Sequence, residues 1–194
     1  MKVEVLGSYG GNTSSHRLTG FLIDDFLAVD AGCLTSALPL ERQYAISDVL
    51  VSHSHSDHTG TLPYLVDNQF GFTQGPLRIH GSQWVIDVIK RHIFNDVIWP
   101  DFLRLPNPDT PSIEYVRLNN ERSFQLKHLR ITPIEVNHIV PCFGFLIRSE
   151  RSQSSLLYTA DTTTTNRVWE LANASENLKG VIIDCSFPNQ MKQL

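Results

Sequence analysis

The segment from residue 53 to residue 60, which reads HSHSDHTG, constrains this chain more than any other stretch. It contains three histidines and an aspartate, and it follows SDVLV, which has the apolar character of a buried strand. A core histidine is usually single and has one hydrogen-bond partner, so three imidazoles within six residues are difficult to bury for packing alone. A divalent cation that binds them together would explain the crowding. The segment therefore predicts a metal centre where a strand ends.

The composition is that of an ordinary globular protein. The 194 residues can form one domain with a substantial core, and 41% of them are hydrophobic and 19% charged. A net charge of −4 provides no basic surface for nucleic acid, so we expect no nucleic-acid partner. Bound dications would still allow an anionic substrate. The three cysteines are odd in number and widely spaced, which favours buried thiols over disulfides.

No segment has the character of a targeting or membrane-spanning sequence. The N-terminal KVEVLG reads as a strand, and no apolar run approaches the roughly 18 residues that a membrane span requires. We therefore expect a cytoplasmic protein without a membrane partner.

Short segments rich in β-branched or aromatic residues, and bounded by Gly, Asp, Asn or Pro, predict strands. They cover residues 3–7, 19–24, 26–32, 48–53, 77–81, 112–118, 129–136, 143–148, 155–161 and 180–186. Helices are expected at residues 60–70, 82–94 and 166–174, the last with Thr164 or Thr165 as N-cap. In the second helix the spacing predicts one core face, formed by Trp84, Val85, Val88, Ile89 and Ile93. The two groups of strands predict two sheets packed face to face with helices outside.

Four further predicted strands end in a polar residue: Asp30, His80, His138 and Asp161. Taken singly, an aspartate in that place usually caps a turn or a helix. The lone histidines, which also include His16, His92 and His128, are individually better explained as surface or hydrogen-bonded residues.

In combination, these residues resemble a known ligand series. H-x-H-x-D-H, followed by a lone strand-end His and a lone strand-end Asp, is the ligand order of the metallo-β-lactamase fold. The resemblance implies an α+β fold, a four-layer αββα sandwich, in a single domain over residues 1–194. It also implies that His53, His55 and His138 bind one metal, that Asp57 and His58 bind a second, and that Asp161 bridges both. Asp30 would orient the metal-binding loop from behind the ligands.

Within this superfamily the chain is most similar to the class II cyclic-nucleotide phosphodiesterases. The similar stretches are SHSHSDHTGTLPYLVDN, RHIFNDVIWPDF, YTADT and DCSFPN. This resemblance implies hydrolysis of 3′,5′-cyclic AMP, or cyclic GMP, to the 5′-monophosphate by attack of a metal-activated hydroxide on phosphorus. Asp57 and Asp161 would be catalytic, and one or two Zn²⁺ per chain, or Mn²⁺, would be the cofactor.

Two departures from the family pattern matter. The family supplies a last histidine near its C-terminus, whereas no histidine follows His138 here. We therefore expect a domain truncated at its C-terminus, a ligand from elsewhere, or a weak second metal site. In addition, Ala160 stands where the family has glycine, which is tolerable only if the position does not need a positive φ.

Other functions remain open from the sequence. An RNase Z-like nuclease shares H-x-H-x-D-H and the aspartate of ADT, but we find no basic cluster or arm-like insertion for tRNA. Another metal-dependent phosphodiester or ester hydrolase, or a non-catalytic metal-binding domain, would also fit. The oligomeric state is open, with a homodimer among the alternatives.

Overall fold

The computed structural model describes residues 1–185, which form two compact units. The first unit is Met1–Leu118, and the second begins at Asn119. The expectation that they act as one domain stays a prediction.

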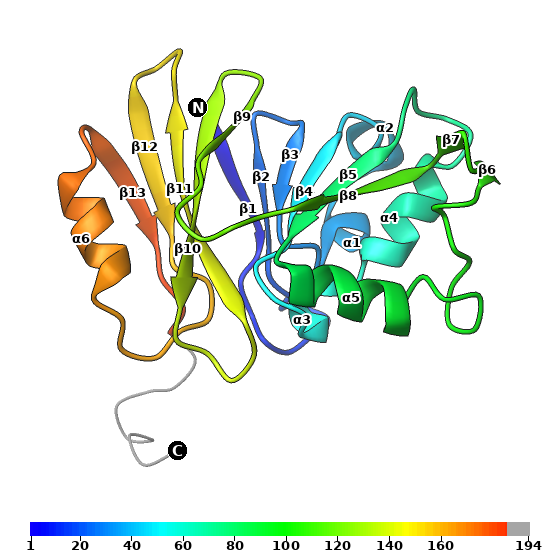
Figure 1. The fold of residues 1–194 in the computed structure, drawn as a ribbon, viewed down its shortest axis with the longest axis horizontal. Helices are drawn as coiled ribbons and strands as arrows, with labels where there is room; N and C mark the ends of the chain where they lie inside the picture. Colours follow the sequence, from blue (N-terminus) through cyan, green and yellow to red (C-terminus); the bar gives the residue numbers. More distant parts are fainter. Residues whose placement is uncertain (186–194) are drawn as a thin grey trace. The chain divides into compact units, whose positions relative to one another are not determined.

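The first unit contains a six-stranded sheet in the order β1-β2-β3-β4-β5-β8. Strands β1 to β3 form an antiparallel meander, and β3, β4, β5 and β8 run parallel (Figure 1). Parallel neighbours need a crossover connection, which explains why helices separate these strands along the chain. The bounds of the six strands are β1 Val3–Gly7, β2 Gly20–Ile23, β3 Leu27–Val29, β4 Asp48–Leu50, β5 Leu77–Gly81 and β8 Ile113–Arg117.

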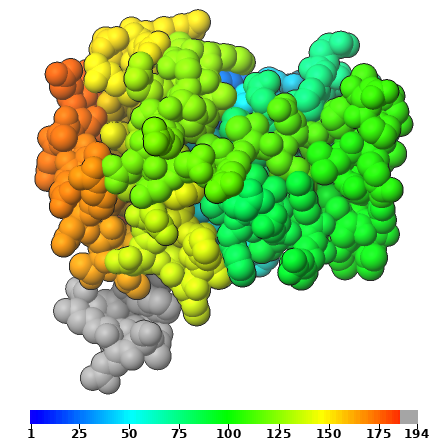
Figure 2. All heavy atoms as spheres, in the orientation of Figure 1, coloured from blue at the N-terminus to red at the C-terminus, as the bar shows by residue number. Residues whose placement is uncertain are grey.

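Short helices connect the parallel strands. They are α1 Leu34–Ala37, α2 Leu40–Gln43, α3 Ser56–Thr59, α4 Leu62–Gln69 and α5 Gln83–His92. A small ribbon, β6 Pro106–Asn107 and β7 Thr110–Pro111, precedes β8. The segment between α5 and β6 lies on the surface in Figure 2, where Val97 and Ile98 are 83% and 65% exposed. No helix among the described residues is long and apolar enough to cross a membrane.

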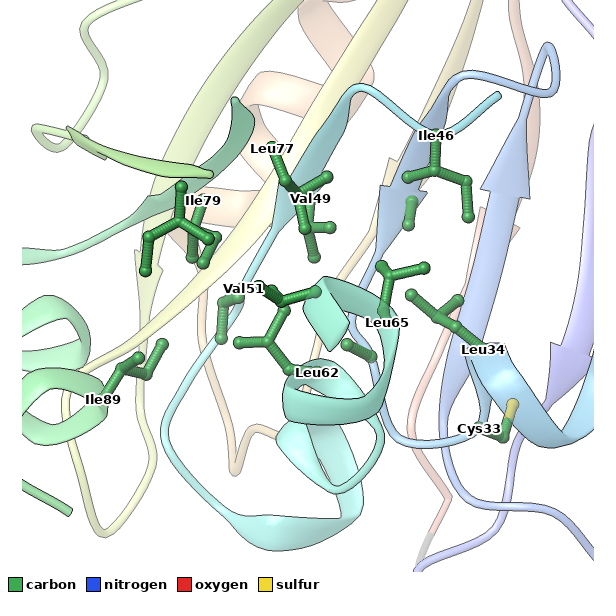
Figure 3. Packing of buried hydrophobic residues seen from close by; sticks show 14 of the residues in the cluster. Cys33, Leu34, Ile46, Val49, Val51, Leu62, Leu65, Leu77, Ile79 and Ile89 are labelled. Atoms are coloured by element: carbon green, nitrogen blue, oxygen red, sulfur yellow. The ribbon is translucent and has the colours of Figure 1, made fainter. Parts of the chain in front are cut away.

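The core of the first unit lies between one face of the sheet and its helices (Figure 3). Alternate residues of β5, including Ile79, belong to the same buried cluster as Leu62 and Leu65 of α4 and Ile89 of α5. In α5 the buried residues are Val85, Ile86 and Ile89. The prediction that Trp84 belongs to the core face is wrong, because the indole is 50% exposed. At 100° per residue, Trp84 lies on the opposite side of the helix from these buried residues.

The buried carboxylate of Asp48 in β4 pairs with two alternate residues of β5, Arg78 and His80. The carboxylate of Asp48 accepts hydrogen bonds from Nε and Nη2 of Arg78, each at 2.7 Å, and lies 2.8 Å from Nε2 of His80. Burial alone would raise the pKa of Asp48, but hydrogen bonds from His80, Arg78 and Ser47 hold it well below its ordinary value. His80 is therefore a hydrogen-bonded core residue, which agrees with the expectation that a lone histidine is a surface or hydrogen-bonded residue.

The second unit contains a five-stranded sheet in the order β13-β12-β11-β10-β9. Its strands are β9 Phe124–Leu126, β10 Leu129–Val136, β11 Cys142–Ser149, β12 Ser154–Tyr158 and β13 Leu178–Ile182. Because β10 and β12 both pair antiparallel with β11, their carboxyl ends meet at the same edge. Helix α6, Arg167–Ala174, connects β12 to the parallel strand β13 and packs on β10 and β11.

Two local predictions for the second unit are wrong. The N-cap of α6 is Asn166 in an αR conformation, with no capping side-chain hydrogen bond, rather than Thr164 or Thr165. Among the cysteines, Cys33 and Cys142 are buried as expected, but Cys185 is exposed. The last residues of the predicted strand 180–186 and of the DCSFPN motif lie outside the described residues.

Candidate metal centre

The histidine-rich segment leaves β4 at the carboxyl edge of the parallel strands. The backbone bends at Ser54 and is extended at His55, which has φ −65° and ψ 150° and precedes the single turn of α3. Asp57 and His58 lie within that turn. This backbone places His53 beside His55 and Asp57 beside His58, and the rings of His53 and His58 are also in contact, with centroids 4.1 Å apart.

His53 and His55 present two ring nitrogens to one point. Nε2 of His53 lies 3.1 Å from Nδ1 of His55, and the two rings meet edge to face at 80°. Two nitrogens that bind one zinc ion at a tetrahedral angle lie about 3.3 Å apart, given Zn–N distances of roughly 2.0–2.1 Å. The pair therefore has the separation that two ligands of one metal require.

Asp57 and His58 form the second donor pair. Oδ2 of Asp57 lies 3.5 Å from Nε2 of His58, and the Asp57 side chain is 23% exposed whereas His58 is buried. Burial alone would raise the pKa of the Asp57 carboxyl, but the hydrogen bond and charge of His58 outweigh it and lower the pKa. The carboxylate therefore stays ionised at neutral pH and can act as an anionic ligand.

Asp30 supports these residues from behind. It follows β3, adopts a φ of +59°, and is completely buried. Its Oδ2 lies 2.7 Å from Nδ1 of His58, and its Oδ1 accepts a 2.8 Å hydrogen bond from the backbone N–H of Ser52. The hydroxyl of Ser52 donates to Oδ2 of Asp30 at 2.9 Å and lies 3.0 Å from Nδ1 of His53.

Ser52 is a site residue that the sequence reasoning missed. Its one signal is its place between a buried strand and the first histidine of the motif. A small polar residue at a strand end is common, so this signal is weak.

Gly32 allows the loop after β3 to contact α3. The backbone N–H of Ala31 donates to the carbonyl oxygen of His58 at 2.7 Å. A Cβ atom on Gly32 would lie 1.9 Å from the carbonyl oxygen of Asp57, so only glycine fits there.

His138 and Asp161 belong to the second unit, where they lie in loops that leave the same edge of the sheet. His138 is two residues beyond β10, Asp161 is three beyond β12, and both are half-buried. The backbone N–H of Thr163 donates to the carbonyl oxygen of Asn137 at 2.8 Å, and Nδ2 of Asn137 donates to Thr164 O at 2.6 Å. These bonds join the two loops beside their candidate ligands.

Ala160, next to Asp161, adopts a φ of +52°. Alanine was expected to replace the family's glycine without strain only if this position has a negative φ, and the structure does not meet that condition. Alanine is held in a conformation that usually favours glycine, immediately before a candidate ligand.

Comparison with known proteins assigns the family. The sequence model of the class II cAMP phosphodiesterases matches residues 39–194, which include six of the seven candidate site residues. This chain belongs to the class II cAMP phosphodiesterase family. Family membership thus confirms the resemblance that the motifs indicated.

Curated relatives agree with the family assignment. The 3′,5′-cyclic-nucleotide phosphodiesterase 1 of Saccharomyces cerevisiae is 24% identical over 184 residues, covering 81% of this chain and 49% of the yeast protein. A probable 3′,5′-cyclic-nucleotide phosphodiesterase of Yersinia pestis is 27% identical, covering 98% of this chain and 66% of that protein. The chain spans about half the length of the first yeast relatives that it matches.

Solved structures confirm the fold. Unliganded yeast PDE1 matches with a TM-score of 0.79 at 19% identity, covering 98% of this chain and 76% of the yeast chain. The metallo-β-lactamase fold protein YhfI of Bacillus subtilis matches with a TM-score of 0.73 at 22% identity, covering 95% and 71% of the two chains. Human tRNase Z, short form, matches with a TM-score of 0.59 at 14% identity, covering 97% and 98%. The predicted α+β metallo-β-lactamase fold is therefore confirmed, and these likenesses concern the fold alone.

Proposed function

We propose that this chain is a metal-dependent phosphodiesterase that hydrolyses 3′,5′-cyclic AMP, or cyclic GMP, to the 5′-monophosphate. The observation that carries the proposal is the pairing of donors in the first unit, at 3.1 Å for His53 and His55 and 3.5 Å for Asp57 and His58. This pairing occurs in a chain whose family is the class II cAMP phosphodiesterases.

The donor set fits divalent metal ions. Imidazole nitrogens with a carboxylate suit zinc, and manganese is the alternative cofactor. His53 and His55 would hold the first metal together with His138, and Asp57 and His58 would hold the second. Asp161 would bridge the two ions, because a carboxylate has two oxygens and an imidazole offers one nitrogen. The family match extends from residue 39 to residue 194, so it includes every one of these six ligands, which supports their use in one centre.

Metals in this centre would supply the electrophilic activation of the phosphodiester and the activation of water. The chain's own residues would arrange the ligands around that chemistry. The buried Asp30 carboxylate fixes the ring of His58 by its bond to Nδ1, so that Nε2 faces Asp57. Asp57 is the more exposed member of its pair, and its lowered pKa keeps the carboxylate ionised, as a metal ligand requires.

Assays with four substrates test the proposal: cyclic AMP, cyclic GMP, the baseless diester bis(p-nitrophenyl) phosphate, and a precursor tRNA. We expect zinc-loaded protein to hydrolyse a cyclic nucleotide and to leave precursor tRNA intact. A His53→Ala, His55→Ala double variant should lose this activity, whereas a variant of the exposed His92, His92→Ala, should retain it. Cleavage of precursor tRNA, or tight metal binding without turnover of any diester, would contradict the proposal and favour the nuclease or the non-catalytic alternative.

A further inference from the structure

The hydroxyl of Ser52 connects Asp30 to His53 inside the first unit. Its oxygen lies 2.9 Å from Oδ2 of Asp30 and 3.0 Å from Nδ1 of His53. All three residues have an exposed fraction of 0%. Polar groups this deeply buried are positioned by their hydrogen bonds, because each unmade bond is costly.

The direction of these bonds follows from counting hydrogens. An ionised carboxylate accepts only, so Ser52 donates its single hydroxyl hydrogen to Asp30. Toward His53 the same oxygen can then act as an acceptor only, which requires a hydrogen on Nδ1 of His53. The lone pair of His53 is thereby left on Nε2, the atom that lies 3.1 Å from Nδ1 of His55.

The same carboxylate oxygen also determines the tautomer of His58. Nδ1 of His58 lies 2.7 Å from Oδ2 of Asp30, and 3.4 Å from the Ser52 hydroxyl. Because Asp30 can only accept, Nδ1 of His58 carries a hydrogen, and Nε2 is the nitrogen that faces Asp57. One buried carboxylate thus selects the metal-facing nitrogen of a histidine in each donor pair, directly for His58 and through Ser52 for His53.

We propose that Ser52 is a positioning residue. Its hydroxyl donates to Asp30 and accepts from Nδ1 of His53, which leaves the lone pair of His53 on Nε2 to bind a divalent metal. The inference rests on the proposed function insofar as His53 is a metal ligand. It predicts a specific proton arrangement before any metal binds, and this arrangement can be measured without turnover.

The first test uses the metal-free wild-type protein. Nitrogen-15 NMR of the imidazoles distinguishes the two neutral tautomers, and the His53 signals are assigned by their loss in a His53→Gln variant. We expect His53 as the Nδ1–H tautomer in the wild type. Observation of the Nε2–H tautomer would overturn the inference, whatever the activity of the protein.

The second test compares Ser52→Ala with Ser52→Thr, which keeps a hydroxyl, and with Ser123→Ala as a control at an exposed serine. Removal of a group that orients a metal ligand typically weakens metal affinity by about 10- to 100-fold. We expect that loss of zinc affinity in Ser52→Ala, with altered absorption bands of the cobalt-substituted protein and a lower kcat at little-changed KM. Ser52→Thr and Ser123→Ala should stay close to the wild type.

Wild-type zinc affinity and cobalt spectrum in Ser52→Ala would overturn the inference. If Ser52→Ala does not fold, as judged by circular dichroism, the NMR measurement on the wild type decides. The two proposals fail separately. A wild type that shows the expected tautomer and the Ser52 effect on zinc, but hydrolyses no cyclic nucleotide, refutes the proposed function alone. An active wild type with an unchanged Ser52→Ala variant refutes the role of Ser52 alone.

Discussion

At the residue scale, Asp30 and Ala160 adopt backbone conformations with a positive φ, which are unfavourable for most residues other than glycine. Asp30 has a φ of +59°, a region that aspartate tolerates better than most residues. In this position its carboxylate accepts hydrogen bonds from three groups: the backbone N–H and the hydroxyl of Ser52, and Nδ1 of His58. Ala160 is less suited to its φ of +52°, and such a residue costs on the order of 1–3 kcal/mol. Both residues lie beside the proposed ligands, where surrounding contacts must hold them.

Asp161→Asn tests the bridging role at this scale. The amide loses the negative charge and binds dications poorly through its nitrogen, whereas the carboxylate would set the separation of the two ions. We expect kcat to fall by orders of magnitude, while the thermal midpoint changes modestly because Asp161 is half-buried. Steady-state kinetics and thermal unfolding would measure both effects.

The control is Asp109→Asn, which removes a carboxylate from an exposed residue of the first unit. It should leave kcat unchanged. Near-normal turnover in Asp161→Asn would exclude a bridging carboxylate at this position.

The residues differ in how far the sequence could reveal them. The spacing of His53, His55 and His58 is readable, because a chain has few other reasons to crowd imidazoles. Ser52 could not be found in this way, since its role arises only when β3 and β4 pair. The backbone N–H of Asp30 then donates to Leu50 O at 2.8 Å, which brings the aspartate beside Ser52.

At the element scale, the strands of both sheets with clear β-branched or aromatic character were predictable, whereas several elements of three or four residues without such a pattern were not. The bounds of β5 and β10 agree with the expected strands at residues 77–81 and 129–136. Helices α1 and α2 and strand β9 were not predicted. Each has only three or four residues, too few to show a period, and tertiary contacts therefore decide their conformation.

Gly32→Ala tests the contact between the loop after β3 and α3. Its Cβ would lie 1.9 Å from Asp57 O and 2.6 Å from Thr19 O, so the backbone of α3 must move. We expect a loss of about 1–3 kcal/mol in the free energy of unfolding, as for other overpacked sites. Zinc affinity should also fall, because Asp57 and His58 move with the helix. Urea unfolding and zinc titration would measure the two effects.

Gly11→Ala provides the matched control. A Cβ at Gly11 meets no atom within 4 Å, so the same substitution adds a methyl group to open space. Equal behaviour of the two variants would show that the close approach at Gly32 does not position α3.

At the scale of the whole molecule, family and fold are better determined than the completeness of the metal centre. The family match spans residues from both compact units, and the fold agrees with yeast PDE1 at a TM-score of 0.79. The proposed ligands are divided between the units, with His138 and Asp161 in the second. Sequence order can predict such a ligand series, but it carries no information on how two units are placed.

The ligand inventory leads to the last prediction, which concerns the second metal. The first ion would have His53, His55, His138 and Asp161, whereas the second would have Asp57, His58 and the shared Asp161. Within residues 1–194, to which this prediction applies, no histidine follows His138. Water can complete the second coordination sphere, but it fixes the geometry less firmly than a protein ligand does. We therefore expect zinc titration to resolve one tight and one weaker site.

Hydrolysis of cyclic AMP should follow occupancy of that weaker site, because a two-metal displacement needs both ions. At one equivalent of zinc the chain should be poorly active, and excess Zn²⁺ or Mn²⁺ should raise the rate. Free imidazole, as a substitute ligand, should increase the rate further at subsaturating metal, whereas N-methylation of both ring nitrogens, in 1,3-dimethylimidazolium, should abolish this rescue. Full activity at stoichiometric metal, or two sites of equal affinity, would show that the second ion needs no further protein ligand.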